Sequence, residues 1–168
     1  TGAGGAEVME YVGIPTLAAI CEAETALASI GRRQDLEIVL MGGIRDGIEA
    51  VKGLCLGADA IALGTAAIIA GGCIACMQCH VGQCVTGIAT QDPEHEKRYK
   101  AQVEAQHIYT FLESVRWQIA AITKALGHNN VTGLCRDDLV ALTPEAAEIT
   151  GLPYVPERRD AELFQAAG

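Results

Sequence analysis

Aromatic residues, basic residues and long apolar runs are all scarce in this sequence. Aromatics make up 4% of its 168 residues, whereas glycine and small aliphatic residues are abundant. That composition favours closely packed layers of helix and sheet over an all-β sandwich. A chain of this length can bury one sizeable core, so we expect a single α/β domain.

The shortage of basic residues and of apolar runs argues against two classes of partner. Lys and Arg number 12 against 21 Asp and Glu, which gives a formal net charge of −9, and no basic cluster is visible. We therefore expect no nucleic-acid partner. No apolar run reaches the length of about 18 residues that crosses a bilayer, so we expect no membrane contact. Residues 1–11 also lack the basic and apolar regions of a signal peptide.

Cysteine, in contrast, is frequent and clustered. Four of the seven cysteines, Cys73, Cys76, Cys79 and Cys84, form the pattern C-x2-C-x2-C-x4-C. Clustered thiols in a chain without a signal sequence bind metal more often than they form disulfides, so we expect a reducing, cytoplasmic setting. The spacing is close to that of ferredoxin iron–sulfur ligands, with a last gap longer by one residue and Val85 in place of proline.

Two other interpretations of the cysteines stay open. C-x2-C is also a zinc-binding pattern, and His80 could complete a zinc site. Buried thiols can also act as small hydrophobes. We favour that role for Cys21, Cys55 and Cys135, which lie on expected helix faces or in a turn.

Strands and helices are expected to alternate in the first half of the chain. Residues 37–41 and 60–63 are short apolar runs typical of buried parallel strands. Three helices are expected here. The first opens at Ile14-Pro15, the second covers residues 46–56 and the third covers residues 65–70. This succession is the βαβ pattern of a parallel sheet, which places ligands at the carboxyl ends of its strands.

The second half of the chain is expected to be an irregular cysteine loop followed by helices. The loop covers residues 71–91, and apolar residues at intervals of three and four then predict a long helix that ends at Gly127. Trp117 lies off the apolar stripe of this helix. Short helices are expected at residues 137–142 and 144–149. We divide the chain into 1–91, a helical extension of the same domain at 92–156, and a poorly ordered tail at 157–168.

A glycine turn follows each expected strand. Gly42 and Gly43 come after the first strand and before a helix, with Arg45 close by, and Gly64 and Thr65 repeat the arrangement after the second. Glycine allows close approach of the backbone, and a helix N-terminus attracts anions. These paired turns predict a phosphate site such as the one after strands 7 and 8 of a (β/α)8 barrel. The alternative is that the glycines only make tight turns.

The segment GTAAIIAGGCIACMQCHVGQC at residues 64–84, followed by TGIATQDPE, resembles the flavin- and cluster-binding part of the glutamate synthase large subunit. The resemblance is to the FMN-binding synthase domain, especially its compact archaeal-type form, and covers Thr1 to about Tyr154. It implies a (β/α)8 TIM barrel that binds FMN and a [3Fe-4S] cluster. That family makes glutamate from 2-oxoglutarate and glutamine-derived ammonia, with electrons from a reductase subunit or ferredoxin.

The resemblance also implies roles for particular residues. The cluster ligands fall on Cys73, Cys79 and Cys84. The turns that bind the FMN phosphate fall on the following residues: Gly42, Gly43, Arg45, Gly64 and Thr65. Thr1 to Ala3 resemble a glycine-rich loop near the flavin and substrate. No acid/base pair in this chain stands out as catalytic.

Three departures from the family pattern are visible. Cys76 is an additional cysteine, which we expect not to be a ligand, and Val85 replaces a proline. Only about the last two barrel strands are present, so the remainder of the barrel is an expected partner. Two alternatives stay open: the related methylamine–glutamate N-methyltransferase subunit, and a non-catalytic iron–sulfur or zinc module that relays electrons.

Overall fold

The computed structural model describes residues 5–156, which form a helix-rich α/β structure around a small parallel sheet. The expected tail at 157–168 and Thr1 to Ala3 lie outside these residues. The strands are β1 (Val39–Met41) and β2 (Ala60–Ala62). The α-helices are α1 (Ala6–Tyr11), α2 (Thr16–Ser29), α3 (Gly47–Cys55), α4 (Thr65–Ala70), α5 (Pro93–Glu96), α6 (Ala101–Ala125) and α7 (Pro144–Thr150). The 3-10 turns are η1 (Arg33–Asp35), η2 (Cys79–Val81), η3 (Val131–Gly133) and η4 (Arg136–Asp138).

The two strands pair in parallel, and helices cover one face of the sheet. Val39 lies opposite Ala60 and Met41 opposite Ala62. Leu40 points into the core beneath α2 and α3, where a Cβ on Gly53 of α3 would lie only 2.6 Å from a Leu40 methyl carbon. The absence of a side chain at that position lets the helix approach the sheet closely.

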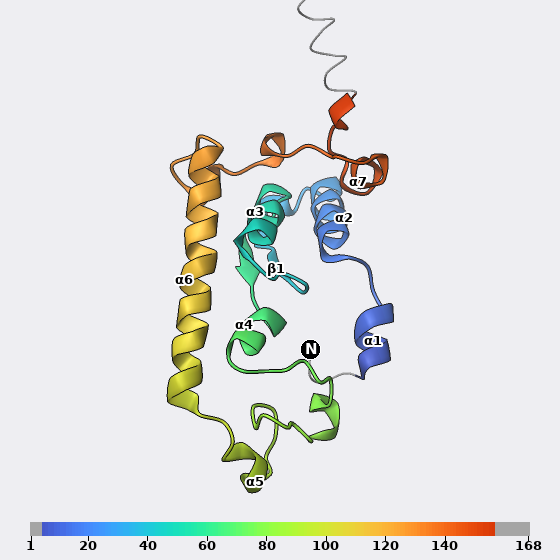
Figure 1. Ribbon diagram of the computed structural model, residues 1–168. Helices are drawn as coiled ribbons and strands as arrows, with labels where there is room; N and C mark the ends of the chain where they lie inside the picture. The colour runs from blue at the N-terminus through green and yellow to red at the C-terminus, as the bar shows by residue number, and fades with distance from the viewer. Residues whose placement is uncertain (1–4, 157–168) are drawn as a thin grey trace, which may run out of the picture.

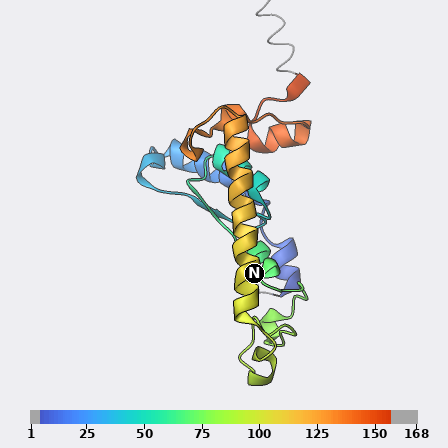
Figure 2. The same ribbon diagram turned by 60° about the vertical axis from the view of Figure 1, so that its left-hand side comes forward.

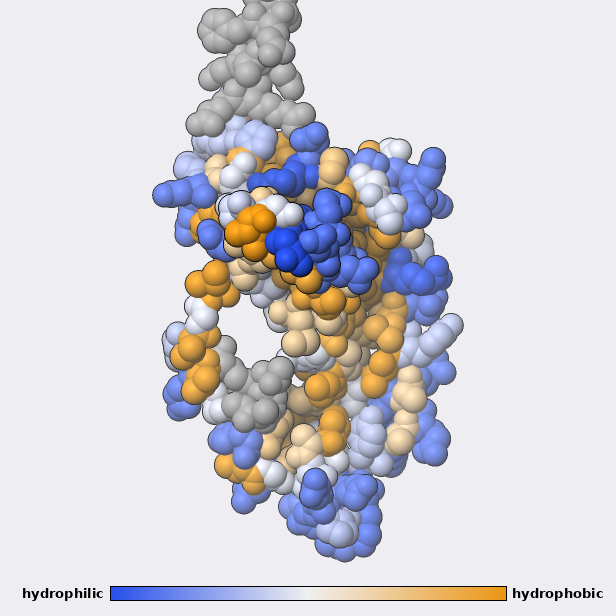
Figure 3. Space-filling model, turned by 180° about the vertical axis from the view of Figure 1, so that it is seen from behind, coloured by the Kyte–Doolittle hydropathy of each residue, from blue (hydrophilic) through white to orange (hydrophobic). Residues whose placement is uncertain are grey.

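The opposite face of the sheet has no covering layer within residues 5–156. Val39 and Met41 alternate with Leu40, so they point to this other face, and they are 60% and 64% exposed. In the space-filling view, apolar residues gather along the wall of an opening through the molecule (Figure 3). Parallel strands are ordinarily buried on both faces, so this face is built for a further layer.

Residues with helix-capping side chains start three of the helices. Asp46 accepts from the N–H of Glu49 at the start of α3, and Thr143 accepts from Ala146 at the start of α7. At the start of α5, the side chain of Asp92 accepts from the N–H of Glu94, and proline occupies the first helical position.

Two segments differ from the sequence-based prediction. Helix α1 was not expected, because its six residues are too few to show a clear period. The helix expected at 137–142 is a 3-10 turn that ends at Asp138. The chain is then extended, because Ala141 pairs in parallel with Tyr154.

Helix α6 is a straight rod along one side of the molecule (Figures 1 and 2). Its 25 residues span about 37 Å at 1.5 Å per residue. It contacts α3 and α4 with its apolar stripe, while Trp117, off that stripe, is 68% exposed. None of the helices described here is both long and apolar enough to cross a bilayer.

The edge of the sheet where the strands begin is fastened by Arg33. Its guanidinium pairs with Glu24 of α2 and with Asp59, at 2.9 Å from the latter, and donates to the carbonyl of Gly57 at 2.8 Å. Asp59 also accepts from the N–H of Ile38 at 2.7 Å. That backbone hydrogen bond, followed by those from Arg33, holds the pKa of Asp59 below its usual value despite partial burial.

Replacing Arg33 by alanine in the full-length protein is expected to lower the free energy of unfolding by about 1–2 kcal/mol, because several partly buried acceptors lose their donor. Arg32→Ala is the matched control: Arg32 pairs with Asp35 where both side chains are more than half exposed. We expect a change within about 0.5 kcal/mol there. Urea denaturation measures both, and equal losses would contradict the role given to Arg33.

Candidate functional site

The two predicted glycine turns lie at the same edge of the sheet. Because Met41 pairs with Ala62, the turns that follow them leave the carboxyl ends of neighbouring parallel strands. Gly42 and Gly43 have φ angles of 114° and 68°, a region that favours glycine. The hydroxyl of Thr16 donates to the carbonyl of Gly42 at 2.7 Å, which fixes the turn to the start of α2.

The start of α3 is more fully bonded than the sequence predicts. The N–H of Gly47 donates to Oε1 of Gln118 at 2.8 Å, and the N–H of Glu49 donates to Asp46 at 2.9 Å. The N–H of Arg45 donates to a Glu49 oxygen at 2.7 Å. The amide groups of residues 45, 47 and 49 are therefore already satisfied, so an anion beside the first turn would have to use the glycine backbone of residues 42–43.

Arg45 lies at the first turn but is paired within the chain. Its guanidinium bonds the carboxylate of Glu49, with Nε 2.9 Å from Oε1, and its side chain is 80% exposed. The hydrogen bond from Arg45 lowers the pKa of Glu49. Because the Arg45 side chain is long and largely in solvent, it can reach a phosphate by leaving Glu49.

The second turn is open. Helix α4 begins after Gly64 without a side-chain cap. A Cβ placed on Gly64 would have no heavy atom within 4 Å. Uncapped amides beside empty space at the end of a strand are suited to an anion or to the edge of a ring system. Thr65 is exposed at this position.

The cysteine loop is irregular, as expected, but its thiols do not converge. Within residues 5–156, no three side chains among His, Cys, Asp and Glu are grouped so as to hold a metal ion. Cys76 lies between two non-glycine residues with positive φ, Ala75 at 53° and Met77 at 59°. Such conformations are costly and concentrate at functional sites. A metal site often assembles fully only when the metal binds, because bringing free thiols together without a metal does not lower the free energy.

Cys84 is the most highly organised of the loop cysteines. It is 4% exposed, and its sulfur lies 3.3 Å from the hydroxyl of Thr86. Burial opposes ionisation, but hydrogen bonds from Thr86 and from the N–H groups of Ala89 and Ile88 outweigh it and lower the pKa of Cys84 to about 7. This environment favours a thiolate, the form in which cysteine binds metals.

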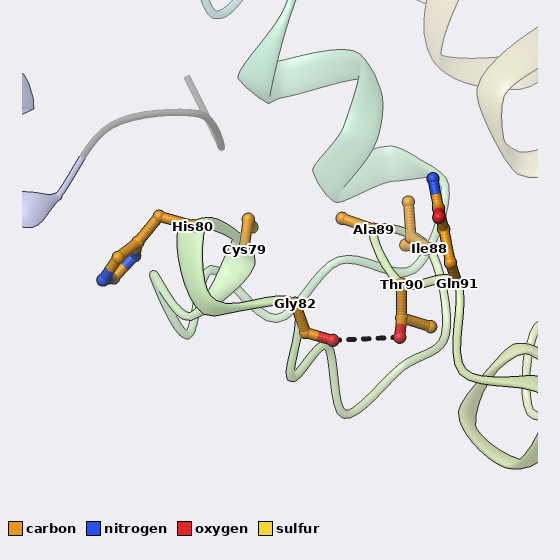
Figure 4. Close-up of a pocket in the computed structure, with 7 residues that line it drawn as sticks. All are labelled: Cys79, His80, Gly82, Ile88, Ala89, Thr90 and Gln91. Atoms are coloured by element: carbon orange, nitrogen blue, oxygen red, sulfur yellow. Dashed lines mark hydrogen bonds between the residues drawn. The ribbon is translucent and has the colours of Figure 1, made fainter.

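A hollow of ≈ 530 Å³ lies beside η2 and the segment that follows Cys84. It is lined by Cys79, His80, Gly82 and residues 88–91 (Figure 4). The hydroxyl of Thr90 donates to the carbonyl of Gly82 at 2.9 Å and joins the two sides of the loop. His80 points away from the other labelled residues in Figure 4, and its Nδ1 lies 3.1 Å from the carbonyl of Met77.

Three residues of this region escaped the sequence-based prediction. Gln118 bonds the start of α3 from 71 residues away, so no local pattern connects them. Thr86 and Thr90 organise the loop through hydroxyl groups. Their position directly after a cysteine cluster was the available signal, since hydroxyls commonly bond loop backbone and thiolates.

The chain is similar to several proteins of one kind. A family model described as the conserved region in glutamate synthase matches residues 1–129. The archaeal glutamate synthase [NADPH] of Methanocaldococcus jannaschii is 36% identical over 161 residues, which cover 94% of this chain and 32% of that protein. The glutamate synthase large subunit-like protein of Rhizobium meliloti is 37% identical, over 86% of this chain and 36% of that protein.

A more distant relative is the glutamate synthase [NADH] of Saccharomyces cerevisiae. It is 30% identical over 131 residues, which cover 78% of this chain but 6% of that protein. The chain thus spans about a third of the length of the first two relatives and far less of the yeast protein.

Proposed function

Because this chain belongs to the glutamate synthase family, we propose that it is the part of an FMN-dependent glutamate synthase that holds the flavin phosphate and an iron–sulfur cluster. The observation that carries the proposal is the sheet. Its two strands are covered by helices on one face, expose Val39 and Met41 on the other, and carry both glycine turns at their carboxyl edge.

That arrangement fits the last two strands of a (β/α)8 barrel. In such a barrel the helices lie outside and the inner strand face meets side chains from the other strands. The exposed face of Val39 and Met41 would then point into the barrel, and the remaining strands would supply the missing layer. The ligand site would lie at the carboxyl edge, where the two turns are.

The residues at the turns fit an FMN phosphate. The backbone of Gly42 and Gly43 would approach one side of it, and the uncapped start of α4 at Gly64 and Thr65 the other. The space beside Gly64 is open: a Cβ there would have no heavy atom within 4 Å apart from its chain neighbours. Arg45 would add a charge-assisted contact after exchanging Glu49 for the phosphate.

The donor set of the loop fits an iron–sulfur cluster. Cys73, Cys79 and Cys84 would be its ligands, which is the number that a [3Fe-4S] cluster takes. Cys84 already lies in an environment that favours the thiolate, and the loop around Cys76 has the costly backbone conformations that a ligand-binding loop displays. Cys73 and Cys79 would swing toward Cys84 as the cluster binds.

When bound, the cluster would carry electrons from a reductase subunit or ferredoxin, and the flavin would pass a hydride to the imine formed from 2-oxoglutarate and glutamine-derived ammonia. This chain's own residues bind and orient the two groups. The glycine turns hold the phosphate end of the flavin, and the cysteine loop, which follows α4 directly, holds the metal centre close to the same side of the barrel.

The test is a spectroscopic and activity assay of the full-length protein, purified without oxygen. Flavin bands, an oxidised [3Fe-4S] signal in electron paramagnetic resonance and glutamate formation from 2-oxoglutarate and glutamine would support the proposal. Methylamine-dependent activity without glutamate synthesis would assign the chain to the transferase subunit instead. A cluster or zinc without flavin would leave an electron-relay or structural module.

A separate prediction concerns the isolated chain. Residues 1–168 alone should retain FMN poorly, because the two turns contact the phosphate while the ring system would lack the walls that the other strands provide. Ultrafiltration of the refolded chain with FMN, beside the full-length protein, measures this difference. Stoichiometric, tightly bound FMN on the isolated chain would contradict it.

A further inference from the structure

Helix α6 touches the backbone on both sides of the site at places where a side chain would not fit. Near its middle, a Cβ on Gly47 would lie 2.6 Å from Cβ of Gln118 and 2.7 Å from the carbonyl oxygen of Val115. Almost three turns before Gln118, toward the start of the helix, a Cβ on Gly71 would lie 2.8 Å from Ile108. These glycines allow the helix to lie directly on the chain.

The first contact fixes the turn at which we place the flavin phosphate. Gln118 accepts the hydrogen bond of Gly47 at 2.8 Å, at the first helical position of α3. Gly47 follows the cap residue Asp46 and is four residues from Gly43. The side chain of Gln118 therefore holds the first residue of α3, which Asp46 caps, and with it the end of the turn that leaves β1.

The second contact fixes the root of the cysteine loop. Gly71 and Gly72 directly precede Cys73, whose N–H still donates to the carbonyl of Ile68 at 3.1 Å. Ile108 packs on Gly71, and the carboxylate of Glu104 lies 3.1 Å from the Cβ position of Gly72. Glu104 is held in turn by Nδ1 of His107 at 2.9 Å.

Both contacts belong to one rigid element. Glu104 and Gln118 are 14 residues apart on α6, which corresponds to about 21 Å along the helix axis. The helix has no glycine or proline between them, so nothing in its sequence favours a kink. Figure 1 shows the same helix running past both α3 and α4.

We propose that α6 sets the separation between the flavin-phosphate turn and the cluster loop, with Gln118 as the positioning residue for the turn and Ile108 and Glu104 as the positioning residues for the loop. This inference rests on the proposed function for the identity of the two groups. A fixed separation matters because electron transfer between two centres depends steeply on their distance. The helix itself touches neither group.

The experiment compares three variants of the full-length protein: Gln118→Ala, Ile108→Ala and, as a control, Gln106→Ala, which alters an exposed glutamine of the same helix. Hydrogen exchange reports the backbone of residues 42–48 and 71–74 separately. Titration of FMN into the flavin-free protein and electron paramagnetic resonance of the cluster report the two sites.

Gln118→Ala is expected to speed exchange at residues 42–48 and to weaken FMN binding about tenfold, because the amide of Gly47 loses its acceptor. The cluster signal should stay as in the wild type. Ile108→Ala should do the reverse: faster exchange at 71–74 and a broadened cluster signal, with FMN affinity within about twofold of the wild type. Gln118→Glu keeps an acceptor in the same place and should restore both exchange and affinity.

The comparison is made on wild-type protein that has bound flavin and cluster. The inference is overturned if Gln118→Ala and Ile108→Ala exchange their backbone hydrogens at the same rates as this wild type, or if either variant disturbs both sites equally. A Gln106→Ala variant as strongly affected as Gln118→Ala would overturn it as well. Wild-type protein that binds neither flavin nor cluster would overturn the proposed function, and the separation of the two groups with it.

Discussion

Cys84→Ser in the full-length protein is expected to abolish the iron–sulfur cluster and to lower glutamate synthesis by about 100-fold or more. A serine hydroxyl is a poor ligand for iron compared with a thiolate. The site around Cys84 is the only one of the three proposed ligand positions at which the described chain already supplies both burial and hydrogen bonds to the sulfur. The substitution therefore removes the one proposed ligand whose sulfur is already buried and hydrogen-bonded.

Iron content and the low-temperature electron paramagnetic resonance spectrum measure the result directly. Cys76→Ser is the matched control, because it makes the same chemical change in the same loop at a cysteine that we do not assign as a ligand. The control should keep an oxidised [3Fe-4S] signal. A cluster that survives in Cys84→Ser, or a [4Fe-4S] cluster that becomes [3Fe-4S] only in Cys76→Ser, would contradict the assigned ligands.

Gly64→Asp is expected to weaken FMN binding by about 1000-fold while leaving the free energy of unfolding nearly unchanged. A Cβ at this position would have no heavy atom within 4 Å apart from its chain neighbours, so we expect the substitution to leave the packing undisturbed. The new carboxylate would, however, enter the space that we assign to the phosphate. Two like charges about 4 Å apart near a protein surface repel by about 4 kcal/mol.

Ser29→Asp provides the charge-matched control. Ser29 is exposed at the far end of α2, about 20 Å along that helix from Thr16, which contacts Gly42. FMN titration followed by fluorescence, together with urea denaturation, measures both variants. An unchanged FMN affinity in Gly64→Asp would show that the phosphate binds elsewhere.

The local elements of the fold could be predicted where a short pattern determines them. The helix at Thr65–Ala70 and the strands around Leu40 and Ile61 lie where apolar runs between glycines place them. Asp46 and Thr143 cap their helices because the capping side chain and its N–H partner are three residues apart. In each case the interacting residues are close together in the sequence.

Contacts between distant parts of the chain could not be predicted in this way. The amides at the start of α3 were expected to be free, but the acceptor for Gly47 comes from Gln118, far along the chain. The cysteine spacing indicates metal binding, but it does not predict which sulfur is buried and hydrogen-bonded by the surrounding chain. The hydrogen bonds to the Cys84 sulfur depend on how the residues that follow Cys84 fold back over it.

The hydrogen bond between Gln118 and Gly47 also has a consequence for the order of folding. It joins residues 71 positions apart, and the entropy lost on closing a loop of that length is about 4 kcal/mol at 25 °C. Contacts so distant in sequence form late, after local helices and turns. The irregular cysteine loop lies within the closed segment, so metal-centre assembly there would shorten the free chain. If the proposed cluster binds there, its assembly and the docking of the long helix would be thermodynamically linked, because each would lower the entropy cost of the other.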